Sequence, residues 1–215
     1  MLKRTLGMLM LVVPVVACSA ADDASVPEAD EATSSVEQPV VNGWIGPVSE
    51  ESWKQSATCG SPGVGATQAW CSGSYCDDMY LFCGSVPQGF ATNGVDRGWT
   101  IYVSEEGGGP AALCPSGAIV DGIRATGSYA DNVSVHCTGA SFPSQGTNCK
   151  WTPWFSEEQG GQTFTGPGLR SAVALGVRCS GSYCDNMSYF VCEPKCRTNA
   201  DCGSDFCVNG VCTIG

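Results

Sequence analysis

The stretch Cys179-Ser180-Gly181-Ser182-Tyr183-Cys184-Asp185-Asn186 decides the fold, because the chain contains it three times. The earlier copies are Cys-Ser-Gly-Ser-Tyr-Cys-Asp-Asp at residues 71–78 and Ala-Thr-Gly-Ser-Tyr-Ala-Asp-Asn at residues 125–132. The central tyrosines follow one another at intervals of 54 residues, as Tyr75, Tyr129 and Tyr183. A stretch that returns at a fixed interval indicates one structural unit used three times.

A second marker repeats in the same order upstream of each tyrosine. It is a tryptophan followed five residues later by Ser-Glu-Glu: Trp44 with Ser49-Glu50-Glu51, Trp99 with Ser104-Glu105-Glu106, and Trp151 with Ser156-Glu157-Glu158. Because the two markers stay in register, we place the three repeats at about residues 43–84, 98–139 and 149–194, within one domain over 43–194.

Each repeat is expected to be a β-hairpin. The runs Ala118 to Arg124 and Ala172 to Arg178 have strand character, and each leads into Gly-Ser-Tyr and a second short strand. Glycine and proline fall too often for a long helix. A single unit is too small to fold alone, so the three should share one core. The sequence therefore predicts an all-β fold of three sheets around a pseudo-threefold axis.

Composition restricts the class of protein. The 215 residues include 15 cysteines, 28 glycines and one histidine, and the formal charge is −11. Such a chain is typical of exported proteins held by disulfides. Ten basic residues are dispersed among 21 acidic ones, so no electropositive face exists to neutralise phosphates. Nucleic acid is not an expected partner, and neither is an anionic membrane surface.

The N-terminus predicts export and a lipid anchor. Two basic residues precede the apolar run Leu6 to Val16, which is too short to span a bilayer. The run ends in Val15-Val16-Ala17-Cys18, which resembles the lipobox of a bacterial lipoprotein. The resemblance implies a signal peptide at residues 1–17, lipidation of Cys18, and a lipid-anchored location at the bacterial outer membrane or cell surface. The alternative is an ordinary cleaved signal in which Cys18 is incidental.

Two further segments flank the repeats. Residues 18–42 carry acidic side chains and no base, and they are expected to form a disordered tether. Residues 195–215 contain Cys196, Cys202, Cys207 and Cys212 and too few apolar residues to fold without disulfides. This tail resembles Dickkopf-type cysteine-rich modules, and we expect a separate mini-module there.

The repeats suggest how the cysteines pair. The middle copy has Ala125 and Ala130 where both outer copies have cysteines, and joint loss is expected of a bonded pair. We therefore pair Cys71 with Cys76 and Cys179 with Cys184. Equivalent positions pair Cys59 with Cys83 and Cys114 with Cys137, which leaves Cys149 for Cys192.

The tail cysteines are harder to assign. We favour Cys196 with Cys207 and Cys202 with Cys212, while the other two connectivities stay open. Cysteine clusters also bind zinc, but the exported location and a single histidine disfavour it. No metal and no cofactor are expected.

The assembled pattern resembles vitelline membrane outer layer protein I. The residues that carry the resemblance are Cys114-Pro115-Ser116-Gly117, the following Ile119 to Arg124, and Trp151-Thr152-Pro153-Trp154. The resemblance covers about residues 43–194. It implies a β-prism of three Greek-key sheets, an extracellular location and carbohydrate binding.

The repeated turns are the candidate binding site. Their aspartates are first expected to bond their own backbone, as turn residues do. The tyrosines beside them could offer a flat face and a hydroxyl to a sugar ring. The candidate ligand-binding residues are Tyr75, Asp77, Tyr129, Asp131, Asn132, Tyr183, Asp185 and Asn186.

Candidates for catalysis are few. His136 alternates with Phe82 between repeats and is expected to be a packed residue. The Glu pairs could serve glycoside hydrolysis, but they recur in every repeat. We expect one Glu of each pair to bond the backbone and the other to be solvated. The repeated tryptophans Trp44, Trp99 and Trp151 are expected in the core.

These observations favour a non-enzymatic module that binds glycans or other envelope components. One alternative is an enzyme that acts on polysaccharide through the Glu pairs. The other is a purely structural envelope protein.

Overall fold

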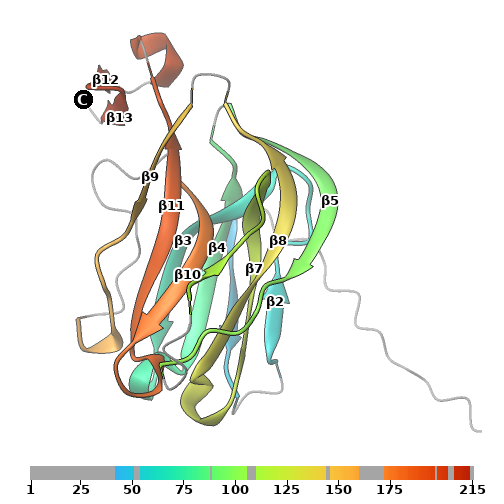
Figure 1. Cartoon of the computed structure of the whole chain (residues 1–215), viewed down its shortest axis with the longest axis vertical. Helices are drawn as coiled ribbons and strands as arrows, with labels where there is room; N and C mark the ends of the chain where they lie inside the picture. Colours follow the sequence, from blue (N-terminus) through green and yellow to red (C-terminus); the bar gives the residue numbers. More distant parts are fainter. Residues whose placement is uncertain are drawn as a thin grey trace, which may run out of the picture. The chain divides into compact units, whose positions relative to one another are not determined.

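The computed structural model describes residues 42–50, 54–87, 89–105, 110–143, 146–159, 172–196, 198–202 and 206–213. These residues form strands and short 3₁₀ turns, so the described part of the chain is all-β, as predicted (Figure 1). It contains no helix long and apolar enough to cross a membrane. The expected signal peptide, the cysteine expected to carry a lipid (Cys18) and nearly all of the expected acidic tether lie outside the described residues.

Three hairpins repeat along the chain, one for each Gly-Ser-Tyr stretch. Each joins a pair of antiparallel strands through a single 3₁₀ turn. The hairpins are β3 (Val64–Ser72), η1 (Ser74–Cys76) and β4 (Asp78–Ser85); β7 (Ala118–Thr126), η2 (Ser128–Ala130) and β8 (Asn132–Ser141); and β10 (Val173–Ser180), η4 (Ser182–Cys184) and β11 (Asn186–Pro194).

A strand that carries the marker tryptophan completes each hairpin into a sheet. These strands are β1 (Gly43–Val48), β5 (Ala91–Trp99) and β9 (Thr147–Trp151), and each pairs with the second strand of its own hairpin. The pairing places each tryptophan opposite an aromatic or imidazole side chain: Trp44 opposite Phe82, Trp99 opposite His136, and Trp151 opposite Phe190.

Short strands link one repeat to the next. β2 (Ser56–Thr58) pairs with β7 of the second hairpin, and β6 (Ala112–Leu113) pairs with β10 of the third. The resulting strand orders are β1-β4-β3, β2-β7-β8-β5 and β6-β10-β11-β9. Each of the last two sheets therefore contains a strand from the preceding repeat, so each of these sheets is built from two repeats.

Each hairpin is interrupted at the same place. The register shifts between Ala66 and Gln68, between Val120 and Gly122, and between Ala174 and Gly176. The extra residues are Thr67, Asp121 and Leu175, which lie at the repeat interval. A bulge re-aims a side chain out of the regular alternation, and in the second sheet that side chain is the carboxylate of Asp121.

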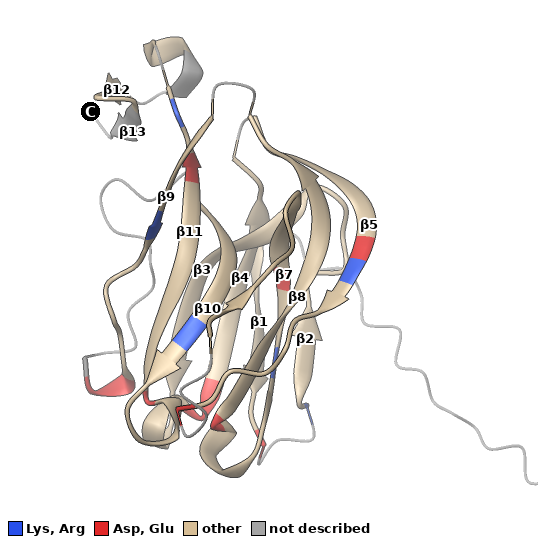
Figure 2. Ribbon diagram, in the orientation of Figure 1, with Lys and Arg blue, Asp and Glu red and all other residues tan. Residues whose placement is uncertain are grey.

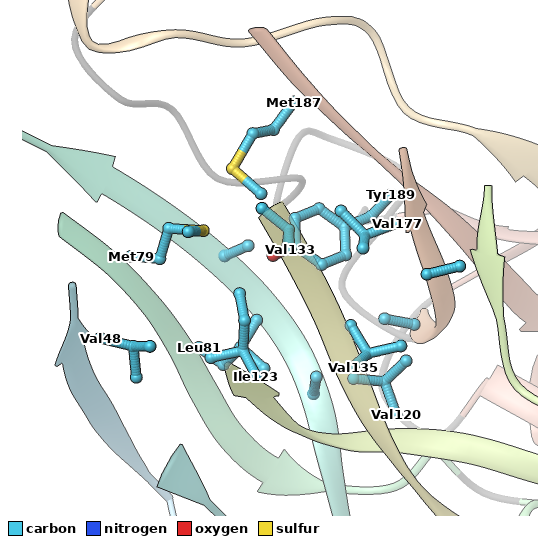
Figure 3. Close-up of a cluster of buried hydrophobic side chains, with 14 of the residues drawn as sticks. Val48, Met79, Leu81, Val120, Ile123, Val133, Val135, Val177, Met187 and Tyr189 are labelled. Atoms are coloured by element: carbon cyan, nitrogen blue, oxygen red, sulfur yellow. The ribbon is translucent and has the colours of Figure 1, made fainter. Parts of the chain in front are cut away.

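The core is formed by equivalent positions of the three hairpins. One set is Met79, Val133 and Met187, and another is Leu81, Val135 and Tyr189, all buried (Figure 3). Every second residue of these strands faces inward, which is why the apolar positions alternate. Burial raises the pKa of the Tyr189 hydroxyl above its ordinary value.

Six disulfides are present among the described cysteines. They join the same residues that the sequence analysis paired: Cys59–Cys83, Cys71–Cys76, Cys114–Cys137, Cys149–Cys192, Cys179–Cys184 and Cys196–Cys207. The remaining prediction, Cys202 with Cys212, lies outside the described side chains.

The C-terminal segment has its own small hairpin. It contains η5 (Asn199–Cys202), β12 (Phe206–Val208) and β13 (Val211–Thr213), with β12 paired to β13. The carbonyl of Gly210 accepts hydrogen bonds from the Asn148 side chain of β9 and from the Cys196 backbone, both at 3.2 Å. These bonds tie the hairpin to the third repeat.

Candidate functional site

The three Gly-Ser-Tyr turns have one backbone conformation. Their glycines have φ of 79°, 83° and 79°, and the tyrosines that follow have φ of 60°, 55° and 57°. A Cβ on Gly73, Gly127 or Gly181 would overlap the carboxylate of the aspartate four residues later. Glycine is therefore required both by its positive φ and by the close approach of that side chain.

The turns bring the three tyrosines together. The ring centroids of Tyr75, Tyr129 and Tyr183 lie 4.9–5.4 Å apart in all three pairings. Each ring is 37–40% exposed. The tyrosines were expected to offer flat faces to a sugar ring, whereas the structure places the rings in one tyrosine cluster in which they contact one another.

A glutamate from a different repeat binds each turn. The backbone N–H of Tyr75 donates to Oε1 of Glu157 at 3.0 Å, and that of Tyr183 donates to Oε1 of Glu105 at 2.8 Å. The backbone N–H groups of Tyr129 and Ala130 donate to the two carboxylate oxygens of Glu50. Consecutive backbone N–H groups in such a turn form a concavity that binds anions.

These contacts form a closed ring around the tyrosine cluster. The first repeat supplies Glu50 to the second turn, the second supplies Glu105 to the third, and the third supplies Glu157 to the first. The first Glu of each pair therefore bonds backbone, as expected. Glu158 is exposed, and the second glutamates of the other two pairs lie outside the described residues.

The turn aspartates act within their own turns. Asp131 Oδ1 accepts a hydrogen bond from Asn132 Nδ2 at 2.6 Å, and Asp185 Oδ1 accepts one from Asn186 Nδ2 at 2.5 Å. Asp77 is buried in the first turn. Figure 2 shows how acidic residues gather at this end of the sheets. All eight predicted site residues thus lie in one region, where most of their polar atoms serve the turns.

A second candidate region lies on the outer face of each sheet, away from the core. We call it the outer-face ladder. It consists of the marker tryptophan, the residue opposite it and a third residue on the first hairpin strand: Trp44, Phe82 and Trp70; Trp99, His136 and Arg124; and Trp151, Phe190 and Arg178. The tryptophan meets its opposite ring at 5.4, 5.0 and 5.2 Å between centroids, respectively.

The ladder of the first sheet is wholly aromatic. Trp70 lies 6.4 Å from Trp44 and is stacked on Tyr80 at 4.7 Å, between centroids. Trp44 is 43% exposed and Trp70 is 38% exposed. The expectation that the marker tryptophans belong to the core is therefore wrong, because the strands turn them outward and side chains such as Leu81, Val135 and Tyr189 fill the interior.

The ladders of the second and third sheets hold an arginine against two aromatic rings. Arg124 Cζ lies 4.7 Å from the Trp99 ring centroid and 4.5 Å from that of Tyr102. Arg178 Cζ lies 4.3 Å from Trp151 and 4.5 Å from Trp154. Tyr102 and Trp154 are each 40% exposed. A guanidinium is attracted to the ring faces by their negative potential.

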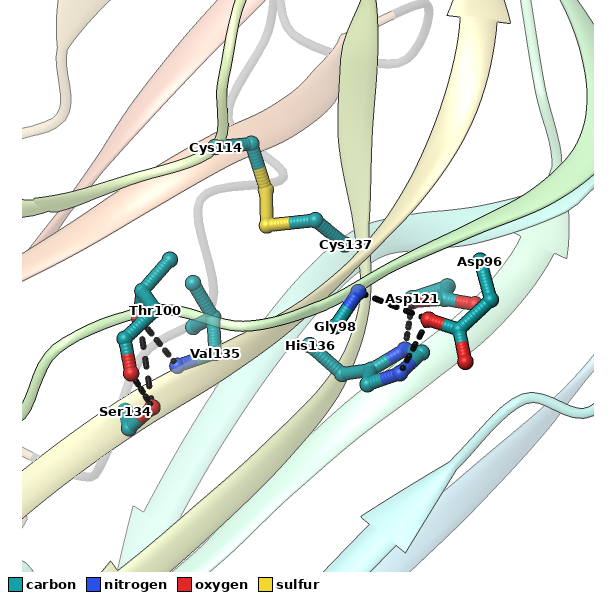
Figure 4. Close-up of a disulfide and its surroundings, with 9 residues drawn as sticks. All are labelled: Asp96, Gly98, Thr100, Cys114, Asp121, Ser134, Val135, His136 and Cys137. Carbon is teal, nitrogen blue, oxygen red and sulfur yellow. Dashed lines mark hydrogen bonds and ion pairs between the residues drawn. A yellow bond between two sulfur atoms is a disulfide. The ribbon is translucent and has the colours of Figure 1, made fainter.

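The ladder of the second sheet ends in a polar pocket. Nδ1 of His136 lies 2.7 Å from Asp121, and Nε2 lies 3.1 Å from Asp96 of β5 (Figure 4). His136 and Asp121 also line the pocket of about 290 Å³, together with Asp96, Thr58 and Thr138. Each ring nitrogen faces a carboxylate, and only the imidazolium can donate from both.

The pKa of His136 is raised above its ordinary value. The main cause is the hydrogen bond to Asp121, and the negative charges of Asp121 and Asp96 act in the same direction against burial. The histidine is thus packed against Trp99, as expected, with a side chain that is 16% exposed, and it is also ion-paired with Asp121 and Asp96. Sequence reasoning missed both aspartates, because Asp121 reaches the histidine only through the bulge and Asp96 comes from another strand.

The chain was compared with known protein families, curated proteins and solved structures, and none of them matches.

Proposed function

We propose that the chain is a non-enzymatic, surface-anchored module that binds a glycan along its outer-face ladders. The observation that carries the proposal is the exposed aromatic ladder of the first sheet, formed by Trp44, Trp70, Tyr80 and Phe82. Aromatic rings that combine an apolar face with exposure to solvent are typical of sites where a sugar ring packs on the protein.

The architecture that would support this function is a three-repeat β-prism. Three hairpins with the same bulge and the same turn, and a ring of glutamates that closes on itself, support that assignment. The assignment agrees with the resemblance to vitelline membrane outer layer protein I. In this arrangement the three ladders face outward in different directions, and a polymeric ligand could engage more than one of them.

We assign the ligand to the ladders rather than to the tyrosine cluster. The tyrosine rings face one another at 4.9–5.4 Å, and their backbone N–H groups are already bound to carboxylates. In the first ladder Trp70 is stacked on Tyr80 and meets Trp44 edge-on, both tryptophans remain exposed, and no hydrogen bond to a carboxylate is seen at either among the described residues. We therefore assign closure of the fold to the cluster, whose turns are already bound by carboxylates, and ligand binding to the ladders.

The anchor is a proposal of the sequence alone. Lipidation of Cys18 would tether the repeats through the acidic segment 18–42 and place them at the cell surface. Replacing Cys18→Ser should move a membrane-pelleting protein into the soluble fraction. Pelleting that does not change would refute the lipid anchor without touching the binding proposal.

A glycan-binding screen tests the function. The purified full-length chain is applied to immobilised polysaccharides, and the supernatant is assayed for new reducing ends. We expect saturable binding without product, and Trp70→Ala should weaken it about tenfold while the unfolding temperature changes little. New reducing ends would favour the hydrolase that uses the Glu pairs. Absence of binding to any polymer would favour the structural protein.

A further inference from the structure

The third residue of each ladder, which lies on the first hairpin strand, differs in charge between the sheets, and this difference indicates what kind of ligand each ladder could bind. The third residue is Trp70 in the first sheet but Arg124 and Arg178 in the second and third. The residue paired opposite changes with it, from Tyr80 to Ser134 and Ser188. The same backbone position thus presents an uncharged ring once and a guanidinium twice.

Each guanidinium is fixed by the rings beside it. In the part of the chain that the structure describes, Trp99 makes no ring contact with Tyr102, and Trp151 makes none with Trp154. Because each pair of rings lies within 4.3–4.7 Å of its arginine Cζ, the two rings flank the guanidinium rather than stack on one another. Contact at the faces leaves the plane of the group open, and all its N–H donors point along that plane.

Those donors have few partners among the residues that the structure describes. Arg178 makes no hydrogen bond or ion pair with any described residue. Arg124 makes one hydrogen bond, from Nη2 to the carbonyl oxygen of Thr100 at 3.5 Å. The Nε–H groups of both arginines are buried without a partner, whereas each arginine as a whole residue is partly exposed, so a ligand would meet the Nη groups.

Neither arginine has a carboxylate partner among the described residues. The described strands and turns carry acidic side chains that could have served an arginine kept for structure, such as Asp78, Glu105 and Glu158. In the second sheet Asp121 and Asp96 both pair with His136, which belongs to the same ladder as Arg124. Figure 2 shows how few basic positions the strands carry at all.

We propose that Arg124 and Arg178 are oxyanion subsites, each binding an acidic group of the ligand. A guanidinium offers two parallel N–H donors that match a carboxylate or sulfate bidentately. This inference rests on the proposed function and narrows its ligand to an acidic polysaccharide. The sugar rings would pack on Trp99, Tyr102, Trp151 and Trp154, and the arginines would receive the acidic substituents.

The test compares acidic polysaccharides with their own neutral forms. Pectate, alginate and hyaluronate are presented to the purified full-length chain, each as the free acid and as the methyl ester, with dextran and dextran sulfate beside them. We expect at least tenfold tighter binding to the acids than to the esters. Binding to dextran sulfate but not to dextran would show that the subsites accept sulfate groups as well as carboxylates. Equal affinity for acid and ester would overturn the inference, and this comparison needs no variant.

Variants locate the subsites. Arg124→Lys and Arg178→Lys keep the charge but lose the planar fork, so each should weaken binding to the preferred acid about tenfold and leave ester binding unchanged. Arg97→Lys, at an exposed position of β5, is the matched control and should have no effect. Lysine variants that bind like the wild type would show that net charge alone is sensed, which also overturns the inference.

The outcome separates the inference from the function it rests on. Neutral polymers that bind in a Trp70-dependent manner, with no preference for acids, would leave the proposed function standing and remove the oxyanion subsites. Failure of every polymer in both forms would remove both.

Discussion

The turn end and the outer faces of the same three hairpins differ in how far the repeats have diverged. The glycines and tyrosines of the turns agree in φ within about 5° of one another. The ladders, built on the same strands, carry Trp70 in one sheet and Arg124 and Arg178 in the others. Each turn contacts the other two, so a change in one affects all three. No ring contact joins the ladder of one sheet to that of another among the described residues. The residues of one ladder can therefore change without affecting the other two.

The largest effect should come from a turn glycine. Gly127 has φ of 83° and ψ of 175°, a conformation that residues with a Cβ avoid, and the added methyl group would also meet Asp131. Gly127→Ala should therefore lower the free energy of unfolding by about 3 kcal/mol in urea titrations. Gly94 has φ of 69° with open space around it. Gly94→Ala should cost only about 1 kcal/mol. Equal losses would mean that the turn carries no special constraint.

A smaller effect is expected from the ring of glutamates. Glu157→Ala removes the acceptor for the Tyr75 backbone N–H and should cost about 2 kcal/mol, a magnitude typical of hydrogen bonds to charged groups. Glu158→Ala is the matched control, because the neighbouring side chain is exposed. Thermal unfolding of the two variants measures the difference. If both behave like the wild type, the ring does not stabilise the fold.

The smallest expected effect is the pH dependence that His136 contributes. Its folded pKa is raised above the unfolded value near 6.5, so its stabilisation is fully present below about pH 6.5. That stabilisation is lost as the pH rises through the folded pKa. His136→Phe, which installs the residue found opposite Trp44 and Trp151, should remove this slope from the free energy of unfolding. A variant that keeps the slope would exclude the ion pairs with Asp96 and Asp121 as its source.

The repeats explain why much of the fold was predictable. Two markers in register gave the three hairpins and their turns, and the paired alanines at 125 and 130 gave the short disulfides. These features depend on contacts close in sequence or repeated along it. The strand exchange of β2 and β6 was not predictable, because each is two or three residues long and pairs with the next repeat.

The candidate site was less accessible to sequence reasoning. The tyrosines were identified, but nothing in a repeat indicates that three turns meet one another or which glutamate binds which turn. The marker tryptophans were placed in the core because bulky aromatics are usually buried. Their outward direction follows from strand register, which the marker spacing does not encode. Arg124 and Arg178 become candidate site residues only through their contacts with Tyr102 and Trp154. These two aromatic residues lie three positions after a marker tryptophan.

We assign stability to the turn end and ligand binding to the outer faces, and one paired measurement tests this division most directly. Tyr129→Ala and Trp70→Ala each remove one aromatic ring of similar exposure, 38% in both cases. Unfolding temperature and affinity for the best-binding polysaccharide are measured on both full-length variants. The account predicts that Tyr129→Ala lowers the unfolding temperature and keeps the affinity of the folded protein. Trp70→Ala should lower the affinity about tenfold and leave the unfolding temperature nearly unchanged. The reverse pattern, with binding lost at Tyr129 and stability lost at Trp70, would contradict it.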